Sequence, residues 1–246
     1  MQAQPLANTH SEWCFRSMFR NLRTAVRARL AKRLNAPSIP ASLERLLANG
    51  FSPTIIHDVG AYRGDFAREC LRIWPESQVH CFEVLPDRVA EIKRLSDQRI
   101  IVHEYLLGET TKVCELHELE TASSVLLEHN NANVPVTRSY PMKTVDEIGI
   151  TPDLLKLDVQ GYEYQVLQGA KATLPGVSVI LAEVNLIDIH RECHLLDELI
   201  GYLREFDFMT YDICGLGRRP LDDALWQADF IFVKRESPLR ANKRWG

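Results

Sequence analysis

The sequence contains no apolar run of the roughly 20 residues that a membrane-spanning helix needs. Its N-terminus lacks the uninterrupted apolar core of a secretory signal. There is no CxxC pair, and the six cysteines are scattered without the regular spacing of a disulfide framework. Internal repeats and low-complexity segments are also missing. We therefore expect a soluble, cytoplasmic protein with reduced thiols.

A net positive charge is confined to the first part of the chain. Residues 1–50 contain eight Lys or Arg and two Glu, a charge of +6, so the net charge of −4 leaves −10 for the remainder. Binding to a nucleic acid requires a basic track along its phosphates. The acidic body of the chain therefore argues against a nucleic-acid partner.

A basic segment near the N-terminus is the exception. Within residues 11–34 apolar side chains recur every three or four residues, which predicts a helix with one apolar stripe and arginines elsewhere. The stripe consists of Phe15, Phe19, Leu22, Val26 and Leu30. Such a basic amphipathic helix can lie on the anionic inner face of a membrane. Alternatively, it packs its stripe on the domain or on a second copy of the chain, as in a homo-oligomer.

Strand and helix patterns alternate in the rest of the chain. Two prolines in residues 35–40 predict a linker, so we divide the chain into residues 1–40 and a domain of residues 41–246. Helices are expected from Ser42 to Asn49, at residues 66–74 and 87–95, and from about Glu163 and His190. Strands are expected at residues 54–59, 78–84, 99–107, 112–119, 134–140, 153–159, 177–184, 208–214 and 229–235. This alternation predicts a doubly wound α/β fold with a parallel sheet.

The turn after the first predicted strand contains two glycines, Gly60 and Gly64. A dinucleotide-binding turn has the pattern G-x-G-x-x-G, and its middle glycine is absent here. At the position of Asp58 a carboxylate would repel a pyrophosphate, because both are negatively charged. A carboxylate there suits a cationic amino group instead. Glu83 ends the second strand, where a carboxylate accepts hydrogen bonds from two ribose hydroxyls. An amine, a ribose and a close backbone approach together describe S-adenosylmethionine. The alternative is an ordinary strand-to-helix turn.

Four stretches of sequence resemble the successive motifs of FkbM-type methyltransferases, a family of S-adenosylmethionine-dependent O-methyltransferases. These stretches are DVGAYRGDF (58–66), FEVLP (82–86), LLKLDVQGYEYQVLQGA (154–170) and ILAEV (180–184). The resemblance covers about residues 50–233. It implies a class I methyltransferase fold, a Rossmann-like, mostly parallel seven-stranded sheet with an antiparallel last strand.

The resemblance also implies which residues contact the cofactor. They lie in the turn after the first strand and at the end of the second strand, and we take them to be Asp58, Gly60, Ala61, Gly64, Glu83 and Val84. Tyr62 stands where the family usually has Asn, and Val84 where it usually has Pro. These two departures concern the loop contacts around the cofactor.

Charged residues near two later strand ends are the candidates for catalysis. A hydroxyl acceptor is a poor nucleophile until a base or a cation helps to remove its proton. Asp158 is the preferred base, assisted by Lys156, and His190 is the rival base because its pKa lies near neutrality. Asp158 and Glu183 should be neighbours, so they could hold Mg²⁺. A purely structural charge network around Lys156 explains the same residues equally well.

Three further features carry weaker signals. His190, Cys193 and His194 form the run HRECH, but without a second cluster at a useful spacing they do not favour a zinc site. His57, inside the first strand, is expected to be a core histidine with satisfied hydrogen bonds. The long stretch of residues 121–133 is rich in side chains that bind hydroxyls, and it is our candidate for acceptor recognition.

Three functions are compatible with these patterns. The first is an O-methyltransferase whose acceptor is a small molecule or glycan, by family resemblance a sugar of a glycan, glycolipid or glycosylated metabolite. The second is a nicotinamide-dependent oxidoreductase, against which Asp58 and the missing glycine argue. The third is a methyltransferase-like scaffold without turnover.

Overall fold

The computed structural model describes residues 36–118, 123–129 and 136–246. The predicted N-terminal helix of residues 11–34 therefore lies outside the described residues. A seven-stranded sheet has the order β3-β2-β1-β7-β8-β10-β9. Its strands are β1 (Ile55–Val59), β2 (Gln78–Phe82), β3 (Ile100–His103), β7 (Leu154–Leu157), β8 (Val179–Asn185), β9 (Phe208–Arg218) and β10 (Leu225–Lys234).

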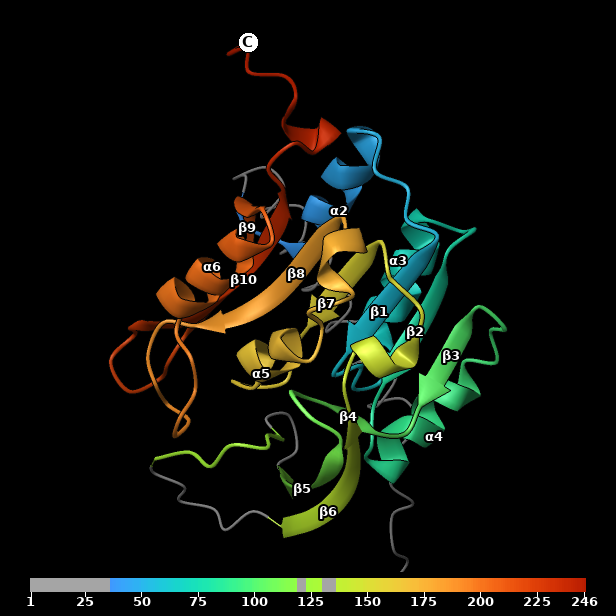
Figure 1. Ribbon diagram of the computed structural model, residues 1–246, viewed down its shortest axis with the longest axis vertical. Coiled ribbons are helices and arrows are strands. Elements are labelled where there is room, and N and C mark those ends of the chain that lie inside the picture. Colours follow the sequence, from blue (N-terminus) through green and yellow to red (C-terminus); the bar gives the residue numbers. More distant parts are fainter. Residues whose placement is uncertain (1–35, 119–122, 130–135) are drawn as a thin grey trace, which may run out of the picture.

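The direction of the strands confirms the predicted fold. The pairs β3–β2, β2–β1, β1–β7 and β7–β8 are parallel. The last strand, β10, runs antiparallel to both of its neighbours, β8 and β9. This is the mostly parallel sheet with an antiparallel last strand that defines the class I methyltransferase fold. Figure 1 shows the parallel strands running toward one edge of the sheet.

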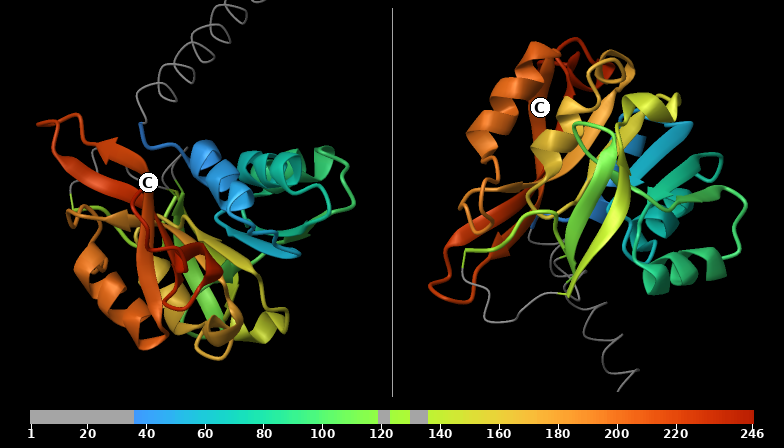
Figure 2. Two further views of the ribbon diagram at one scale, coloured as in Figure 1. Left: turned by 90° about the horizontal axis from the view of Figure 1, so that it is seen from above. Right: turned by 60° about the horizontal axis from the view of Figure 1, so that its bottom comes forward.

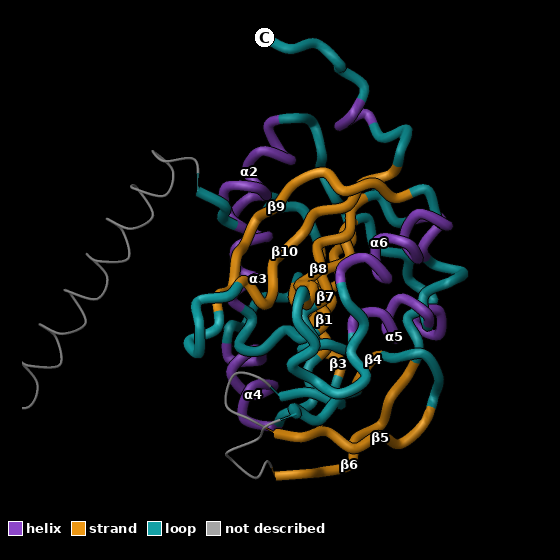
Figure 3. Tube along the Cα trace, turned by 90° about the vertical axis from the view of Figure 1, so that its left-hand side faces the viewer, coloured by secondary structure: helices purple, strands orange, loops and turns teal. Residues whose placement is uncertain are grey.

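Helices cover both faces of the sheet, so its central strands are buried on both sides and carry nearly continuous apolar sequences. Figure 3 shows α2, α3 and α4 on one side of the sheet and α5 and α6 on the other. The helices are α2 (Ile39–Ala48), α3 (Asp65–Ile73), α4 (Pro86–Arg94), α5 (Glu163–Gln168) and α6 (Leu196–Glu205). Residues of β1 enter both core clusters, Ile56 on the α2 and α3 side and Val59 on the other.

A second, three-stranded sheet lies at the carboxyl ends of the parallel strands (Figures 1 and 2). It consists of β4 (Leu106–Leu107), β6 (Val136–Lys143) and β5 (Lys112–Glu118), in that order. The single strand expected at residues 99–107 is therefore wrong, because the chain leaves the large sheet after His103 and pairs again only at β4. This small sheet covers the edge at which ligands bind in doubly wound folds.

Two helix starts also differ from the prediction. α2 begins at Ile39 after the cap residue Ser38, and Ser42 is buried inside it, where its hydroxyl donates to Asp212 Oδ2 at 2.7 Å. The helix expected from about His190 begins only at Leu196. Before it, the backbone amide of Arg191 donates to Leu127 O, so tertiary hydrogen bonds take the place of helical ones.

Position 60 requires a glycine because another segment of the protein's own backbone lies against it. Its φ is +77°, and a Cβ atom there would lie 1.9 Å from the carbonyl oxygen of Asp158. Gly64 also has a φ of +77°, and a Cβ there would lie 3.0 Å from a side-chain atom of Leu95. The two glycines of the first turn therefore let the ends of β1 and β7 meet and let α3 begin.

We predict that Gly60→Ala destabilises the protein by about 1–3 kcal/mol more than Gly149→Ala, because it adds a clash to the cost of a left-handed alanine. Gly149 is a matched control, since its φ is +70° and a Cβ atom added there would have no atom of the described chain within 4 Å. Urea unfolding of both variants measures the difference. An equal loss of stability would show that the contact with Asp158 is unimportant.

Three histidines from adjacent strands line up across one face of the sheet. The rings of His57 and His80 lie 5.3 Å apart, and His80 Nδ1 lies 2.9 Å from His103 Nε2. His57 is a core histidine as predicted, but neither of its buried ring nitrogens has the predicted hydrogen-bond partner among the described residues. Burial and then His80 lower the pKa of His57 to about 3. Burial and then His80 lower the pKa of His103 to about 4.

These lowered pKa values predict a loss of stability in acid. The histidines are neutral in the folded state but take up protons in the unfolded state below pH about 6.5. Their contribution to the free energy of unfolding is fully present above that pH. It is lost as the pH falls toward the folded-state pKa values of about 4 for His103 and about 3 for His57. Between pH 7 and 5, His57→Leu should therefore lose less free energy of unfolding than the wild type. His129→Leu, at an exposed histidine, should keep the wild-type slope.

Candidate functional site

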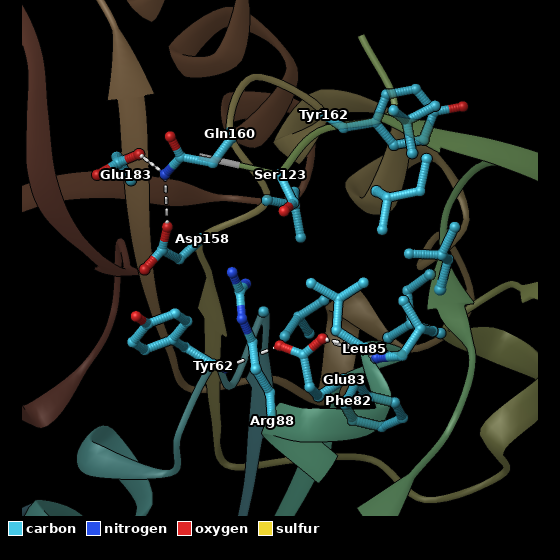
Figure 4. Close-up of a pocket in the computed structure, with 18 of the residues that line it drawn as sticks. Tyr62, Phe82, Glu83, Leu85, Arg88, Ser123, Asp158, Gln160, Tyr162 and Glu183 are labelled. Carbon is cyan, nitrogen blue, oxygen red and sulfur yellow. Dashed lines mark hydrogen bonds between the residues drawn. The ribbon is translucent and has the colours of Figure 1, made fainter. Parts of the chain in front are cut away.

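A cavity of about 500 Å³ lies between the carboxyl ends of the parallel strands and the small sheet. Its size falls within the range of about 300–1,000 Å³ that is typical of small-molecule sites. One part of its wall is apolar and includes Phe82, Val84, Leu85 and Leu116. Polar side chains line the rest, and Figure 4 shows the principal ones.

Glu83 follows β2 and is held by three backbone amides. Tyr62 N donates to Oε2 at 3.0 Å, while Val84 N and Leu85 N donate to Oε1 at 2.8 and 2.9 Å. Burial raises the pKa of Glu83, and these hydrogen bonds together with Arg88 oppose that effect. A carboxylate offers about four lone-pair sites. About one lone-pair site of Glu83 therefore remains for a ligand. The sequence predicted hydrogen bonds from two ribose hydroxyls.

Asp58 has a different partner from the one its position in the sequence suggested. Its carboxylate is completely buried, and its Oδ1 lies 3.0 Å from Lys156 Nζ. The same ammonium group donates to Gly60 O at 3.0 Å and lies 3.2 Å from Asp158 Oδ2. Burial acts to lower the pKa of Lys156, but the two carboxylates outweigh it and raise the pKa. The carboxylate of Asp58, which we expected to bind the amino group of the cofactor, is therefore paired with Lys156.

The predicted cofactor residues divide into two groups. Gly60, Glu83 and Val84 line the cavity. Asp58, Ala61 and Gly64 do not line it; they build the turn behind it.

We predict that Lys156→Met costs about 3–5 kcal/mol of stability, because it leaves the buried carboxyl of Asp58 without its partner. Burial raises the pKa of Asp58, so without Lys156 the stability should fall further as the pH rises above about 4. The double variant Asp58→Asn with Lys156→Met should recover part of the loss. Urea titrations at pH 5 and 8 test both statements. A double variant less stable than Lys156→Met would contradict the pairing.

Asp158 and Glu183 meet through an amide, on the side of the cavity opposite Glu83 in the view of Figure 4. Gln160 Nε2 donates to Asp158 Oδ1 at 3.0 Å and to Glu183 Oε1 at 2.7 Å. Gln227 Nε2 donates to the other oxygen of Glu183 at 2.6 Å. Burial and then Asp158 raise the pKa of Glu183 to about 9. Burial therefore favours the neutral form of Glu183, whereas Asp158 keeps 38% of its side chain exposed.

The remaining predicted residues lie elsewhere. His190 is buried beside Gly161, behind the turn that leads to α5, and does not line the cavity. Within the described residues, no group of three or more His, Cys, Asp or Glu side chains could hold a metal ion. The Mg²⁺ prediction therefore rests only on Asp158 and Glu183. Glu163, the first residue of α5, accepts a hydrogen bond from Val159 N at 2.9 Å and so stabilises the turn between β7 and α5.

Several cavity residues were missed from the sequence. Trp226 and Gln227 line the cavity because β10 begins at Leu225, four residues before the predicted strand. Gln160 lies inside the motif of residues 154–170, but the role of its amide depends on side chains from two neighbouring strands. Of the long stretch of residues 121–133, only 123–129 belongs to the described chain, and Ser123 and Val125 from it line the cavity.

Comparison with known proteins decides the family. The chain matches the family model of the methyltransferase FkbM domain over residues 58–209. It belongs to the FkbM methyltransferase family. No curated protein matches the chain. No helix among the described residues is long and apolar enough to cross a membrane.

The chain also shows a distant similarity to solved structures of methyltransferases. Magnesium protoporphyrin IX methyltransferase from Synechocystis, with bound SAM, is 9% identical, with a TM-score of 0.49 over 94% of this chain and 86% of that chain. The N-methyltransferase NodS from Bradyrhizobium japonicum, in complex with S-adenosyl-L-homocysteine, is 12% identical, with a TM-score of 0.47 over 80% of this chain and 86% of that chain.

Proposed function

We propose that this FkbM-family protein transfers a methyl group from S-adenosylmethionine to a hydroxyl of a sugar-containing acceptor. One observation carries the proposal: a single cavity reaches both the amide-held Glu83 and the Asp158–Glu183 pair. The first is suited to a ribose and the second to the proton of an acceptor hydroxyl. The family assignment favours methyl transfer over the nicotinamide-dependent alternative.

The cofactor fits the Glu83 half of the cavity. The remaining lone pair of Glu83 is available to a ribose hydroxyl, and Val84, Leu85 and Leu116 provide apolar contacts for a flat base. When bound, S-adenosylmethionine supplies a sulfonium methyl group that is already strongly electrophilic. The protein's task is therefore to align the acceptor and to exclude water.

Asp158 is the proposed base. Its carboxylate borders the cavity and is partly exposed, and it is oriented by Lys156 and Gln160. As the acceptor oxygen bonds to the methyl carbon and the carbon–sulfur bond breaks, Asp158 takes the hydroxyl proton. Burial raises the pKa of Glu183 and so opposes a second negative charge beside Asp158. His190 does not border the cavity and is not given this role.

A sugar acceptor is supported by the other side chains at this end. Trp226, Gln227 and Ser123 line this end, and the amide of Gln227 and the hydroxyl of Ser123 are groups that can exchange hydrogen bonds with hydroxyls. A scaffold without turnover remains the competing function. It predicts no methylated product with any acceptor.

The cofactor half of the proposal predicts that Glu83→Ala lowers the affinity for S-adenosylhomocysteine at least tenfold. The loss of the carboxylate removes the ribose contact and frees three amides from their partner. Glu104→Ala, at an exposed glutamate paired with Lys93, should bind as the wild type does. Isothermal calorimetry measures both. Wild-type affinity in a folded Glu83→Ala protein would refute this placement of the cofactor.

The catalytic half predicts that Asp158→Asn lowers kcat by about 100-fold or more, the usual contribution of a general base. The affinity for S-adenosylhomocysteine should stay within about threefold, because an amide of nearly the same shape replaces the carboxylate. Methyl transfer from labelled S-adenosylmethionine to a panel of sugar acceptors provides the measurement. Undiminished turnover in this variant would exclude Asp158 as the base.

A further inference from the structure

Gln160 occupies an unusual position between the two acidic side chains of the site. Its amide nitrogen lies 3.0 Å from Asp158 Oδ1 and 2.7 Å from Glu183 Oε1. An amide group carries two hydrogens, so each carboxyl receives one. The two carboxyls come from the ends of different strands, and Gln160 is the side chain that joins them (Figure 4).

The backbone of Gln160 is held in a conformation that favours glycine. Its φ is +54°, which costs free energy for a residue with a Cβ atom and persists only where the surroundings enforce it. One restraint is Ser124, whose buried hydroxyl donates to Gln160 O at 2.7 Å. A glycine would adopt this backbone without strain, but only a longer amide side chain reaches both carboxyls.

The serine that holds Gln160 lies between two residues of the cavity wall. Ser123 and Val125, on either side of Ser124, both line it. Ser124 Oγ also accepts from Leu126 N at 3.0 Å, which fixes the hydroxyl in place. The segment at the acceptor end of the cavity is thus connected by one hydrogen bond to the residue that bridges the carboxyls.

We propose that Gln160 is a positioning residue: its amide fixes Asp158 relative to Glu183 for proton removal from the acceptor, and Ser124 keeps that amide in place. This inference rests on the proposed function, in which Asp158 is the base. Gln227 contacts the other oxygen of Glu183, and Lys156 lies beside the other oxygen of Asp158. Gln160 is therefore the contact that sets the two carboxyls relative to one another.

Gln160→Gly separates this role from a structural one. It removes the amide but relieves the strained backbone, so the free energy of unfolding should be unchanged or higher. We expect kcat to fall 10- to 100-fold, with the affinity for S-adenosylhomocysteine and the KM for the methyl donor within twofold. Gln160→Met, of similar length but without donors, should show the same fall in kcat. Ser124→Ala should lower kcat less.

Ser96→Gly is the matched control. Ser96 is exposed and has a φ of +53°, so this variant relieves similar strain far from the cavity and should leave kcat unchanged. Turnover within twofold of the wild type in Gln160→Gly would overturn the inference while leaving methyl transfer intact. Loss of wild-type turnover in EDTA, restored by Mg²⁺, would also overturn it, because a cation would then join the carboxyls. Failure of the wild type to methylate any acceptor would overturn both proposals.

Discussion

The buried ammonium group of Lys156 is the interaction on which the site depends. It joins the ends of β1 and β7 by contacting Asp58, the carbonyl of Gly60 and Asp158. These two strand ends approach so closely that a side chain at Gly60 would collide with Asp158. A buried cation without partners is costly, so the three oxygen atoms must stay around it. The turn that borders the cavity and the carboxylate proposed as the base are therefore positioned by the same contact.

The charges of the site follow from this arrangement. Asp58 and Asp158 share the positive charge of Lys156, and no comparable cation contacts Glu183 in the described chain. Burial raises the pKa of Glu183 to about 9 and that of Asp229, also with burial as the main cause, to about 6. Burial thus shifts both unpaired acids toward their neutral forms. Asp158 is partly exposed, which is why we propose it as the acid that acts on a ligand, and the amides of Gln160 and Gln227 each donate to one oxygen of Glu183.

Much of the fold was predictable because strands and helices leave local, periodic patterns. All seven strands of the large sheet and the helices α3, α4 and α5 were expected near their observed positions, since alternating buried segments and Gly or Pro boundaries are properties of short stretches of chain. The errors occurred where long-range contacts decided the outcome. The single strand at residues 99–107 divided because β4 pairs with β6. The helix start at His190 moved to Leu196 because the preceding backbone bonds to residues 127–129.

The sequence by itself determined the fold class, the family and the chemical character of the residues at the strand ends, because these depend on motifs and on periodicity along the chain. Only the tertiary structure decided which of those residues meet. It turned Asp58 away from the cavity toward Lys156, placed His190 behind the wall, and brought Trp226 and Gln227 into the site. It also placed Gln160 between two carboxyls from different strands. The physical reason is that pairing, burial and hydrogen-bond geometry depend on distances between segments, and spacing along the chain does not specify those distances.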